Sequence, residues 1–434
     1  MDFGSNQHPD PRQREASPCG FGGIAEHMEQ AVRLEIRCFF GSALDEEHGG
    51  FITTLAEDWS PLPGDDKSIV HQARTTWTAA EVMRRRPDVA SLKAAVEHGV
   101  RFLIDRMWDN HAGGFWWSVE ESGTPRSEGP SAKHLYGDAF AIYALANAVL
   151  ATGSKDALRA ASEAFDLVEQ RARRSGTRLY HEAFDAENTP ASEDSEAHDS
   201  ISTPLGMCTL NTHLHLLEAY TQLFEAKPDE AVRSALDRLL VIIRDEMVSP
   251  VGAACQFFTP EGAALPTPTS YGHDIETAFL LHEAAKSLGD FPEAKTLPTC
   301  LRLCDHTLRC GLDPLHGGLC EAGSACSDPL SCDKIWWAQV EAVNGWMHFA
   351  SLRPETAHRY IPAALNVWAF AHRYLWDDVH GGWHWSTDRS GSSINRRGKA
   401  NAWKAAYHTT RCLLRACEKL RAFRAEAVNQ GGPA

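Results

Sequence analysis

The sequence is short of positive charge. Its 434 residues include 42 lysines and arginines against 58 aspartates and glutamates, which gives a formal net charge of −16. Nucleic acids and anionic membranes are bound through clustered basic residues, so this balance argues against both kinds of partner. No apolar run approaches the roughly 20 residues that a membrane-spanning helix needs. We therefore expect a globular protein that binds neither nucleic acid nor membrane.

Several other signals are missing. Residues 1–23 lack the basic start and apolar core of a signal peptide, and their polar, Pro/Gly-rich composition predicts a disordered tail. A second flexible tail is expected at 426–434. Without a secretion signal, the twelve cysteines favour free thiols over a disulfide framework, and a cytoplasmic location is expected.

No cofactor signature stands out. Six cysteines lie within the stretch Cys300–Cys332, but none forms the C-x₂-C pair of a structural zinc site, so small buried residues are the preferred interpretation. No G-x-G-x-x-G dinucleotide fingerprint is present between a strand and a helix. We predict that the protein uses no metal and no cofactor.

A short signature recurs along the chain, in which an acidic residue is followed by polar residues, Gly-Gly and then aromatic or aliphatic residues. Clear copies lie at 49–51, 113–116, 317–319 and 381–383, and weaker copies lie at Gly176 and Gly252. Four of the five steps between first glycines are 63 to 65 residues long. The longer step contains the acidic stretch 183–200, which predicts an inserted, mobile surface loop near the pocket. A fixed period of this length indicates six structural repeats.

Each repeat holds two segments with the i, i+3, i+4 apolar spacing of amphipathic helices, and glycines mark where helices end. Examples are 28–40, 100–108, 140–150 and 210–223. The pieces after the glycines, such as 114–119 and 382–387, alternate like small hairpin strands. Six helical hairpins can extend as an open solenoid or close on themselves. No capping repeats are evident, so we predict one all-α domain at 24–425, an (α/α)₆ barrel with short β-hairpins in its loops.

Unusual polar and aromatic residues fall near the starts of the even-numbered helices. From helix two to helix twelve they are Gln72, Arg74 and Trp77; His134, Tyr136 and Asp138; Asn211 and His215; Tyr271, His273 and Glu276; Trp336, Trp337 and Glu341; and Trp403, Tyr407, His408 and Arg411. If the even helices form the inner wall, these starts converge on one mouth of the barrel. Helix N-termini add positive potential there. The sequence therefore predicts a single pocket rich in histidine, tryptophan, arginine and carboxylate.

Helical spacing decides which of these side chains cooperate. Asn211 and His215 share a face, whereas His213 points roughly 160° away, so this pair of histidines is no metal chelate. His273 and Glu276 are three residues apart, which lets the carboxylate orient the imidazole or accept its proton. Trp337 and Glu341, and likewise His408 and Arg411, also share a face.

Four stretches of the sequence resemble the cellobiose 2-epimerases of the N-acylglucosamine 2-epimerase superfamily. They are 211–220 (NTHLHLLEAY), 270–276 (SYGHDIE), 336–342 (WWAQVEA), and 403–404 (WK) followed by 407–408 (YH). The resemblance runs from about residue 25 to 422 and touches all six inner helices. Ala406 and Thr409 stand where the family usually has Pro and Asn, which leaves the chemistry in place and the choice of sugar open.

The resemblance implies an (α/α)₆ barrel and inversion of C2 in the reducing-end glucose of β-1,4-linked disaccharides, such as cellobiose to glucosyl-mannose. The ring opens to an aldehyde, one imidazole removes the C2 proton to leave a cis-enediolate, and a second returns a proton to the other face. Histidine suits both tasks because its ordinary pKa is ~6.5. The assigned catalytic residues are the pair His273 and His408, with Glu276 tuning His273 and with Arg74 and His215 stabilising the O1 anion. The assigned substrate-binding residues are Tyr136, Asn211, Trp337, Glu341 and Trp403.

Other functions remain open at this stage. A D-mannose 2-epimerase or an aldose–ketose isomerase acting on monosaccharides would use the same enediolate. A glycoside hydrolase on the same barrel would need a carboxylate pair, for which Asp138, Glu276 and Glu341 are candidates. A carbohydrate-binding protein would use the aromatic residues without the histidine pair. In each case the partner is a small-molecule sugar, and the chain is expected to be a monomer or homodimer.

Overall fold

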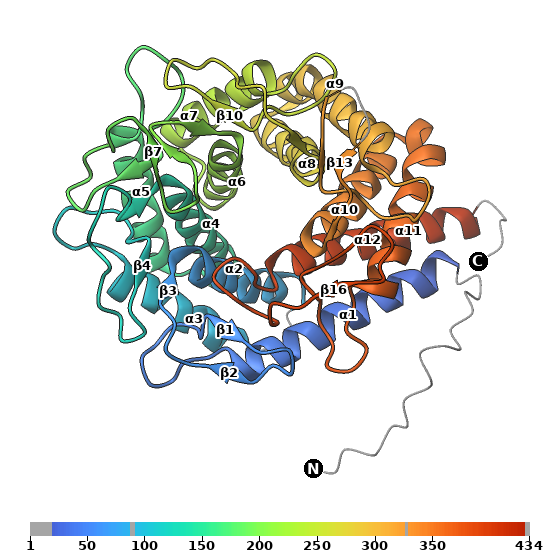
Figure 1. Ribbon diagram of the computed structural model, residues 1–434, viewed down its shortest axis with the longest axis horizontal. Coiled ribbons are helices and arrows are strands. Elements are labelled where there is room, and N and C mark those ends of the chain that lie inside the picture. Colours follow the sequence, from blue (N-terminus) through green and yellow to red (C-terminus); the bar gives the residue numbers. More distant parts are fainter. Residues whose placement is uncertain (1–19, 87–91, 326–328, 430–434) are drawn as a thin grey trace, which may run out of the picture.

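The computed structural model describes residues 20–86, 92–325 and 329–429, and these form twelve α-helices in two concentric layers (Figure 1). The outer helices are α1 (Phe21–Ser42), α3 (Leu92–Phe102), α5 (Lys155–Arg171), α7 (Glu230–Ile242), α9 (Asp290–His306) and α11 (Ala357–Tyr374). The inner helices are α2 (Ile69–Arg85), α4 (Leu135–Thr152), α6 (Leu210–Ala226), α8 (Tyr271–Leu288), α10 (Trp336–Leu352) and α12 (Tyr407–Asn429). The prediction of an (α/α)₆ barrel is confirmed.

The barrel closes because each inner helix packs on the next one around the ring and α12 returns to α2. The outer helix α1 packs on α12, which brings the first and last described helices side by side (Figure 1). One turn of π-helix extends α3 (Leu103–Met107), α7 (Ile243–Met247) and α9 (Thr307–Gly311). A short 3₁₀ turn, Pro354–Thr356, precedes α11. Closure buries the inner helices on almost all sides, apart from the end of α12, where residues 421–425 are largely exposed.

One of the described helices, α4, is long and apolar enough by length and composition to cross a membrane. It stands in the inner layer with 78% of its residues buried inside the protein. Its apolar character on all faces is what an inner-wall helix needs.

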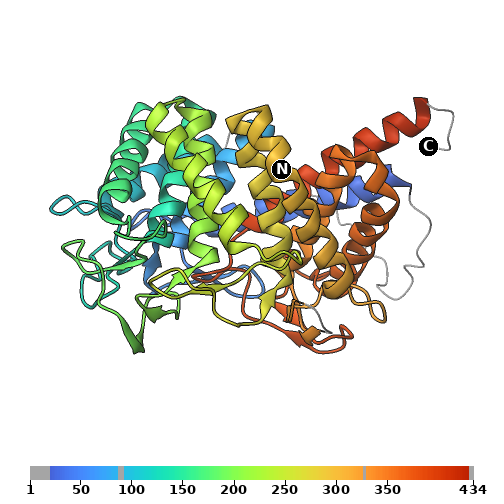
Figure 2. The same ribbon diagram turned by 90° about the horizontal axis from the view of Figure 1, so that it is seen from above.

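The long connections all lead from an outer helix to the following inner helix, so they gather at one end of the barrel (Figure 2). The N-termini of all six inner helices therefore open at the same end. Most of the short antiparallel strands in these loops join neighbouring repeats, since a strand that enters one inner helix pairs with a strand of the next repeat. These pairs are β3 (Lys67–Ser68) with β4 (Ser118–Val119), β5 (Lys133–His134) with β6 (Ala183–Phe184), β9 (Cys208–Thr209) with β10 (Phe257–Phe258), β11 (Thr269–Ser270) with β12 (Ala322–Gly323), and β14 (Lys334–Ile335) with β15 (Ser386–Thr387).

The remaining strands extend or decorate this ring: β13 (Pro329–Ser331) on β12, β16 (Ile394–Asn395) on β15, and the hairpins β1–β2 (Thr54–Leu55, Pro61–Leu62) and β7–β8 (Asp194–His198, Pro204–Leu205). A bridge between Leu55 and Ala400 joins the first loop to the last. The sequence predicted small hairpins after the glycines, and each of the six repeats does hold such a bridge, from Leu44–Phe51 to Trp376–Trp383. It did not predict the pairing between repeats.

The acidic residue of the repeat signature anchors each clear Gly-Gly turn. Asp45 accepts a hydrogen bond from the buried Lys67 at 2.6 Å, and the same Lys–Asp pair recurs in three other repeats. The second glycine is required by space as well as by its positive φ of 69°, because a Cβ at Gly50 would lie 2.6 Å from Gln72 Oε1. The signature is thus a structural device that sets the loop before each inner helix.

In five inner helices, the side chain of the fourth residue binds the loop that carries the glycine turn of the same repeat. Gln72, Asp138, His213, Asp274 and Gln339 each accept the backbone N–H of the residue just after the turn. Asp138 also pairs with Arg171. Both of its oxygens therefore serve the fold, which removes it as a hydrolase carboxylate. His213 is likewise structural, as its position on the helix predicted.

The stability of the fold should fall as the pH drops from 6.5 towards 4, in part because of His213. Burial lowers the pKa of His213 from 6.5 to about 4, and its Nε2 must stay unprotonated to accept the Tyr180 N–H at 3.2 Å. Between these pH values the unfolded chain takes up a proton that the folded chain does not, so the stabilisation is complete above pH 6.5 and lost towards pH 4. Urea unfolding of wild type and His213→Gln across this range should show a flatter pH dependence in the variant. Equal slopes would contradict the assignment.

Two boundary predictions differ from the structure. Helix α1 begins at Phe21, inside the predicted tail 1–23, and α12 continues to Asn429, past the predicted end at 425. The rest of the predicted tails, 1–19 and 430–434, lies outside the described residues. The stretch 183–200 is exposed at most positions from 192 to 198, but Ala183 and Phe184 are buried in β6. The surface-loop prediction was wrong for that apolar pair, because it supplies the strand that pairs with β5.

Candidate active site

The two predicted acid/base histidines come from α8 and α12, the inner helices on either side of α10, and flank one tryptophan of α10. His273, in the first turn of α8, has its ring centroid 5.0 Å from that of Trp337 on α10. His408, at the start of α12, lies 5.4 Å from the same indole. His408 is buried and His273 half-buried. Three helices thus bring the two imidazoles against one indole at the same end of the barrel.

His408 is held by a carboxylate. Its Nδ1 lies 2.6 Å from Glu341 Oε1, which also accepts a hydrogen bond from Arg411 at 2.7 Å. Burial raises the pKa of Glu341, while Arg411 opposes that rise and favours the carboxylate. Because a carboxylate accepts hydrogen bonds, His408 carries its ring hydrogen on Nδ1 and keeps the lone pair of Nε2 for proton transfer. Glu341 was predicted to bind sugar; the structure shows that its Oε1 holds His408.

Both imidazoles are neutral bases at pH 7. Burial lowers the pKa of His273 to about 4, against the opposing charge of Glu276. Burial, with the positive charges of Arg74 and Arg411, lowers the pKa of His408 well below its ordinary value. Each ring thus has a lone pair ready to take a proton. Histidine pKa values shifted by burial in a cleft are typical of catalytic sites.

Arg411 joins the acidic residues of the site. From α12 it donates to Glu218 on α6, Glu276 on α8 and Glu341 on α10, and it also contacts the Tyr407 hydroxyl. Glu276 was predicted to tune His273. It does so through its charge alone, because its Oε1 is bonded to Arg411 and no hydrogen bond to His273 is found. The predicted placement of Glu276 on the same helix face as His273 is right, but the direct hydrogen bond of Glu276 is with the Arg411 guanidinium.

A second buried pair orients His215. Its Nδ1 lies 3.0 Å from Glu218 Oε2, and Glu218 also accepts a hydrogen bond from Tyr407 at 2.9 Å. Burial alone would raise the pKa of Glu218, but Arg411 and His215 hold it well below its usual range. Glu218 therefore stays ionised and fixes the ring of His215 beside Phe140, at 4.6 Å between centroids.

Arg74, on the inner helix α2, also contacts the loop before α12. Its guanidinium stacks 4.4 Å above the Phe140 ring and donates to the Tyr136 hydroxyl at 3.0 Å and to the Trp403 carbonyl at 2.8 Å. Asn211 lies beside the same tyrosine. These contacts bring the predicted residues Arg74, Tyr136 and Asn211 to one side of the pocket.

Trp403 lies in the loop before α12, which begins at Tyr407, so its assignment to that helix was wrong. The Lys404 backbone N–H and ammonium bond to Asn401 and to loop carbonyls, which hold this segment as a turn. The Trp403 side chain is 39% exposed, with centroids 6.1 Å from Trp117 and 6.3 Å from Tyr136. The three rings form an aromatic rim at the mouth of the pocket.

Several buried polar atoms around the pocket have no protein partner among the described residues: His273 Nδ1, Glu276 Oε2, Glu341 Oε2, Arg74 Nε and Asn211 Oδ1. Buried polar groups are normally paired, so this concentration marks a site for a ligand rich in hydroxyl groups. Glu276, Glu341 and His408 also place possible metal ligands within 4.8 Å of one another. Arg411 already bridges the two carboxylates, and its charge disfavours a second cation there.

Sequence reasoning missed Glu218 and Phe140 as parts of the site, and it gave Tyr407 and Arg411 no role there. Glu218 was within reach, because it follows His215 by three residues, the same spacing that singled out His273 and Glu276. The role of Arg411 depends on residues contributed by four helices, and the periodicity of one helix carries no information about such contacts.

Comparison with known proteins decides the family. The family model of N-acylglucosamine 2-epimerase matches residues 50–412. The chain belongs to this family. It is 30% identical over 393 residues to a cellobiose 2-epimerase from Bacteroides fragilis, covering 90% of this chain and 98% of that protein. The structure of the cellobiose 2-epimerase from Spirochaeta thermophila superposes with a TM-score of 0.83 and 32% identity, covering 93% and 98% of the two chains.

A D-mannose isomerase from Marinomonas mediterranea is 25% identical over 402 residues, covering 88% of this chain and 94% of that one. The N-acylglucosamine 2-epimerase family and its relatives make this chain an enzyme of the isomerase class, a sugar epimerase. The resemblance seen in the sequence is confirmed.

Proposed function

We propose that this enzyme inverts C2 of the reducing-end glucose of a β-1,4-linked disaccharide such as cellobiose, with His273 and His408 as the two proton-transfer groups. The observation that carries the proposal is the pair of imidazoles held against Trp337, each with a lowered pKa. Inversion at a carbon next to a carbonyl requires one group to remove a proton and another to return one to the opposite face. Two independently positioned imidazoles supply both.

The steps follow from the contacts. Once the ring has opened, one neutral imidazole takes the C2 proton and the electron pair moves to O1, giving a cis-enediolate. Arg74 stabilises the developing O1 anion through its guanidinium, whose Nε has no protein partner among the described residues. His215 adds a donor when both of its ring nitrogens carry hydrogen, because its Nδ1 is held by Glu218. The other imidazole takes up a proton from water and delivers it to the opposite face of C2, and the first imidazole then releases the proton that it removed to water. Glu341 supports His408 in both states, because it accepts the Nδ1 hydrogen throughout.

The rival functions fit less well. A hydrolase needs a free carboxylate pair, whereas Glu276 and Glu341 share Arg411 and Asp138 serves the fold. Aldose–ketose isomerisation of mannose is favoured by one observation, the relationship to the D-mannose isomerase. The aromatic rim of Trp117, Tyr136 and Trp403 favours a second sugar ring at the mouth and hence a disaccharide.

Replacing Trp403 by alanine should raise KM for cellobiose by about 10-fold, because one missing stacking ring weakens binding by roughly 1–1.5 kcal/mol. The ring is exposed, so the fold should survive. With mannose or glucose, which do not reach the rim, KM should change less than two-fold. NMR time courses with each sugar, following anomeric signals for epimer, ketose or released glucose, measure these values.

The same time courses test the proposal. Wild type should produce glucosyl-mannose from cellobiose, without released glucose. Activity confined to monosaccharides, with ketose as the product, would replace the proposal by mannose isomerisation. An equal loss for cellobiose and mannose in Trp403→Ala would contradict the place given to the second ring.

A further inference from the structure

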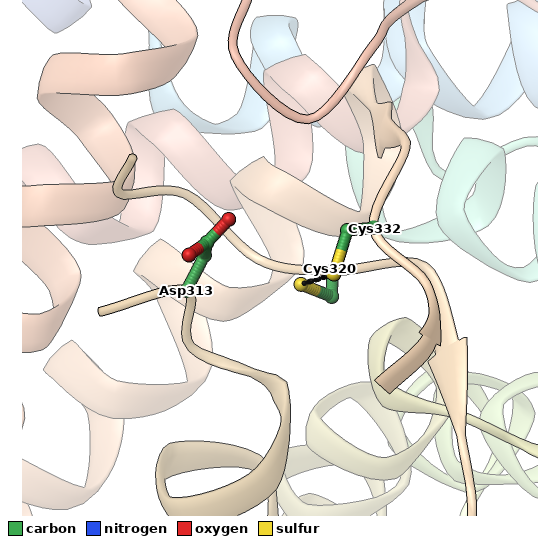
Figure 3. Close-up of side chains that lie close together, drawn as sticks. All are labelled: Asp313, Cys320 and Cys332. Atoms are coloured by element: carbon green, nitrogen blue, oxygen red, sulfur yellow. Dashed lines mark hydrogen bonds between the residues drawn. The ribbon is translucent and has the colours of Figure 1, made fainter. Parts of the chain in front are cut away.

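Two cysteines of the Cys300–Cys332 stretch face each other in the loop before α10. The Sγ atoms of Cys320 and Cys332 lie 2.8 Å apart, with no atom between them (Figure 3). Cys320 is buried, and Cys332 is half-buried between β13 and β14. Their positions in the sequence indicate only packing, and the residues around His273 and His408 do not include them.

The surroundings favour thiol chemistry over metal binding. Asp313 stands close enough to complete a three-ligand site with the two sulfurs. Its carboxylate is already bonded to Lys334 at 3.1 Å and to Arg389 at 2.8 and 2.9 Å. Lys334 Nζ also lies 3.6 Å from Cys320 Sγ. The cationic side chains of Lys334 and Arg389 therefore already occupy the Asp313 carboxylate and would repel a metal ion. The two sulfurs can still react with each other.

We propose that Cys320 and Cys332 form a reversible disulfide by exchange with a low-molecular-weight disulfide such as oxidised glutathione. The half-buried Cys332 reacts first: its thiolate attacks one sulfur of the oxidant, the oxidant's S–S bond breaks, and one glutathione thiol leaves. Cys320 then attacks Cys332 Sγ and releases the second glutathione thiol. The cysteine pair loses two electrons and two protons, and the oxidant, reduced to two thiols, gains both.

The second step should be the slower one. Burial raises the pKa of the Cys320 thiol to about 12, and the charge of Lys334 opposes this rise. Attack needs the thiolate, so Cys320 resolves the mixed disulfide slowly despite its proximity.

The bond would fasten the strands that enter two inner helices of the site. Just after Cys320, β12 pairs with β11, which leads into α8 and His273. Just after Cys332, β14 leads into α10 and Trp337. The sulfurs already touch, so closing the bond needs little movement of either strand. The disulfide therefore stabilises the loop before α10 while leaving the site in place, and it does not depend on which sugar the enzyme takes.

The test compares reduced and oxidised enzyme. Full-length protein carrying Cys326→Ser, which removes the third cysteine of the loop, is equilibrated with oxidised glutathione, alkylated and cut with trypsin and a glutamate-specific protease. Glu321 separates the two cysteines, so the bond should appear as a linked peptide pair that dithiothreitol splits. Oxidation should raise Tm by about 2–5 °C, as expected for a short closed loop in a chain of this size, and leave kcat within about two-fold.

The matched variants are Cys320→Ser and Cys332→Ser, in which the rise in Tm should vanish. Cys255→Ser is the control, because Cys255 occupies the position of Cys320 in the preceding repeat. Alkylation of both cysteines at every glutathione ratio would overturn the proposal, and so would a glutathione adduct on Cys332 that never resolves. A rise in Tm that persists in Cys320→Ser would show that the disulfide is not what stabilises the oxidised protein. The peptide map of the Cys326→Ser protein decides the first point even if a further serine variant fails to fold.

Discussion

Each of the two variants His273→Ala and His408→Ala should have a kcat for C2 epimerisation about 10²–10⁴-fold lower than wild type, the usual contribution of a positioned acid or base. Inversion needs proton transfer on two faces, so neither imidazole can replace the other. The effect should lie in kcat more than in KM, because both rings act on the reacting carbon.

The fold should survive both changes. His273 is half-buried, and its Nδ1 makes no hydrogen bond within the described protein, so removing the ring costs mainly its contact with Trp337. His408→Ala leaves Glu341 still paired with Arg411. His111→Ala, at an exposed loop histidine, is the control and should retain full activity. If either site variant kept more than about a tenth of wild-type kcat, its histidine would not be an obligatory proton-transfer group.

Arg411→Met should lower the free energy of unfolding by about 3–5 kcal/mol, the range seen when one partner of a buried ion pair is removed. The change leaves Glu218, Glu276 and Glu341 close together in the inner wall without their shared cation. Activity should fall as well, because Glu341 and Glu218 would no longer be fixed behind His408 and His215. Urea unfolding and kcat measured on the same preparation give both values.

Arg126→Met is the matched control. Arg126 also pairs with two carboxylates, Asp66 and Glu120, but on the exposed surface, where ion pairs contribute little. Its unfolding curve should overlay that of wild type. A loss below about 1 kcal/mol in Arg411→Met would show that the acidic residues of the inner wall relax without the arginine, and the account of the site would be wrong on this point.

The double-walled barrel could be predicted because the two repeating patterns behind it, the apolar spacing and the Gly-Gly signature, are set by residues close together in the sequence. The spacing of apolar residues fixes each helix, and the Gly-Gly signature fixes where each repeat turns. The phase of polar residues at the even helices likewise predicted that Arg74, His215, His273 and His408 share one end of the barrel. These features depend on which face of a helix a residue occupies, and spacing carries that information.

Contacts between helices could not be predicted in the same way. Glu276 and Glu341 share Arg411, and Glu341 also bonds His408, because these contacts depend on distances across the barrel. Trp403 was grouped with Tyr407, His408 and Arg411 on helix twelve, whereas the bonds of Lys404 hold its segment as a loop. Pairing of strands between repeats also requires knowing how the repeats stack.

Epimerisation of cellobiose in D₂O, followed by NMR at C2 of the product, tests the central claim most directly. An imidazolium exchanges its proton with water, so the two-histidine mechanism predicts glucosyl-mannose carrying deuterium at C2, formed without added NAD. Ketose appearing alongside would show protonation at C1 competing with protonation at C2. Product that retains its original hydrogen at C2, or turnover that requires NAD, would contradict the proton-transfer account.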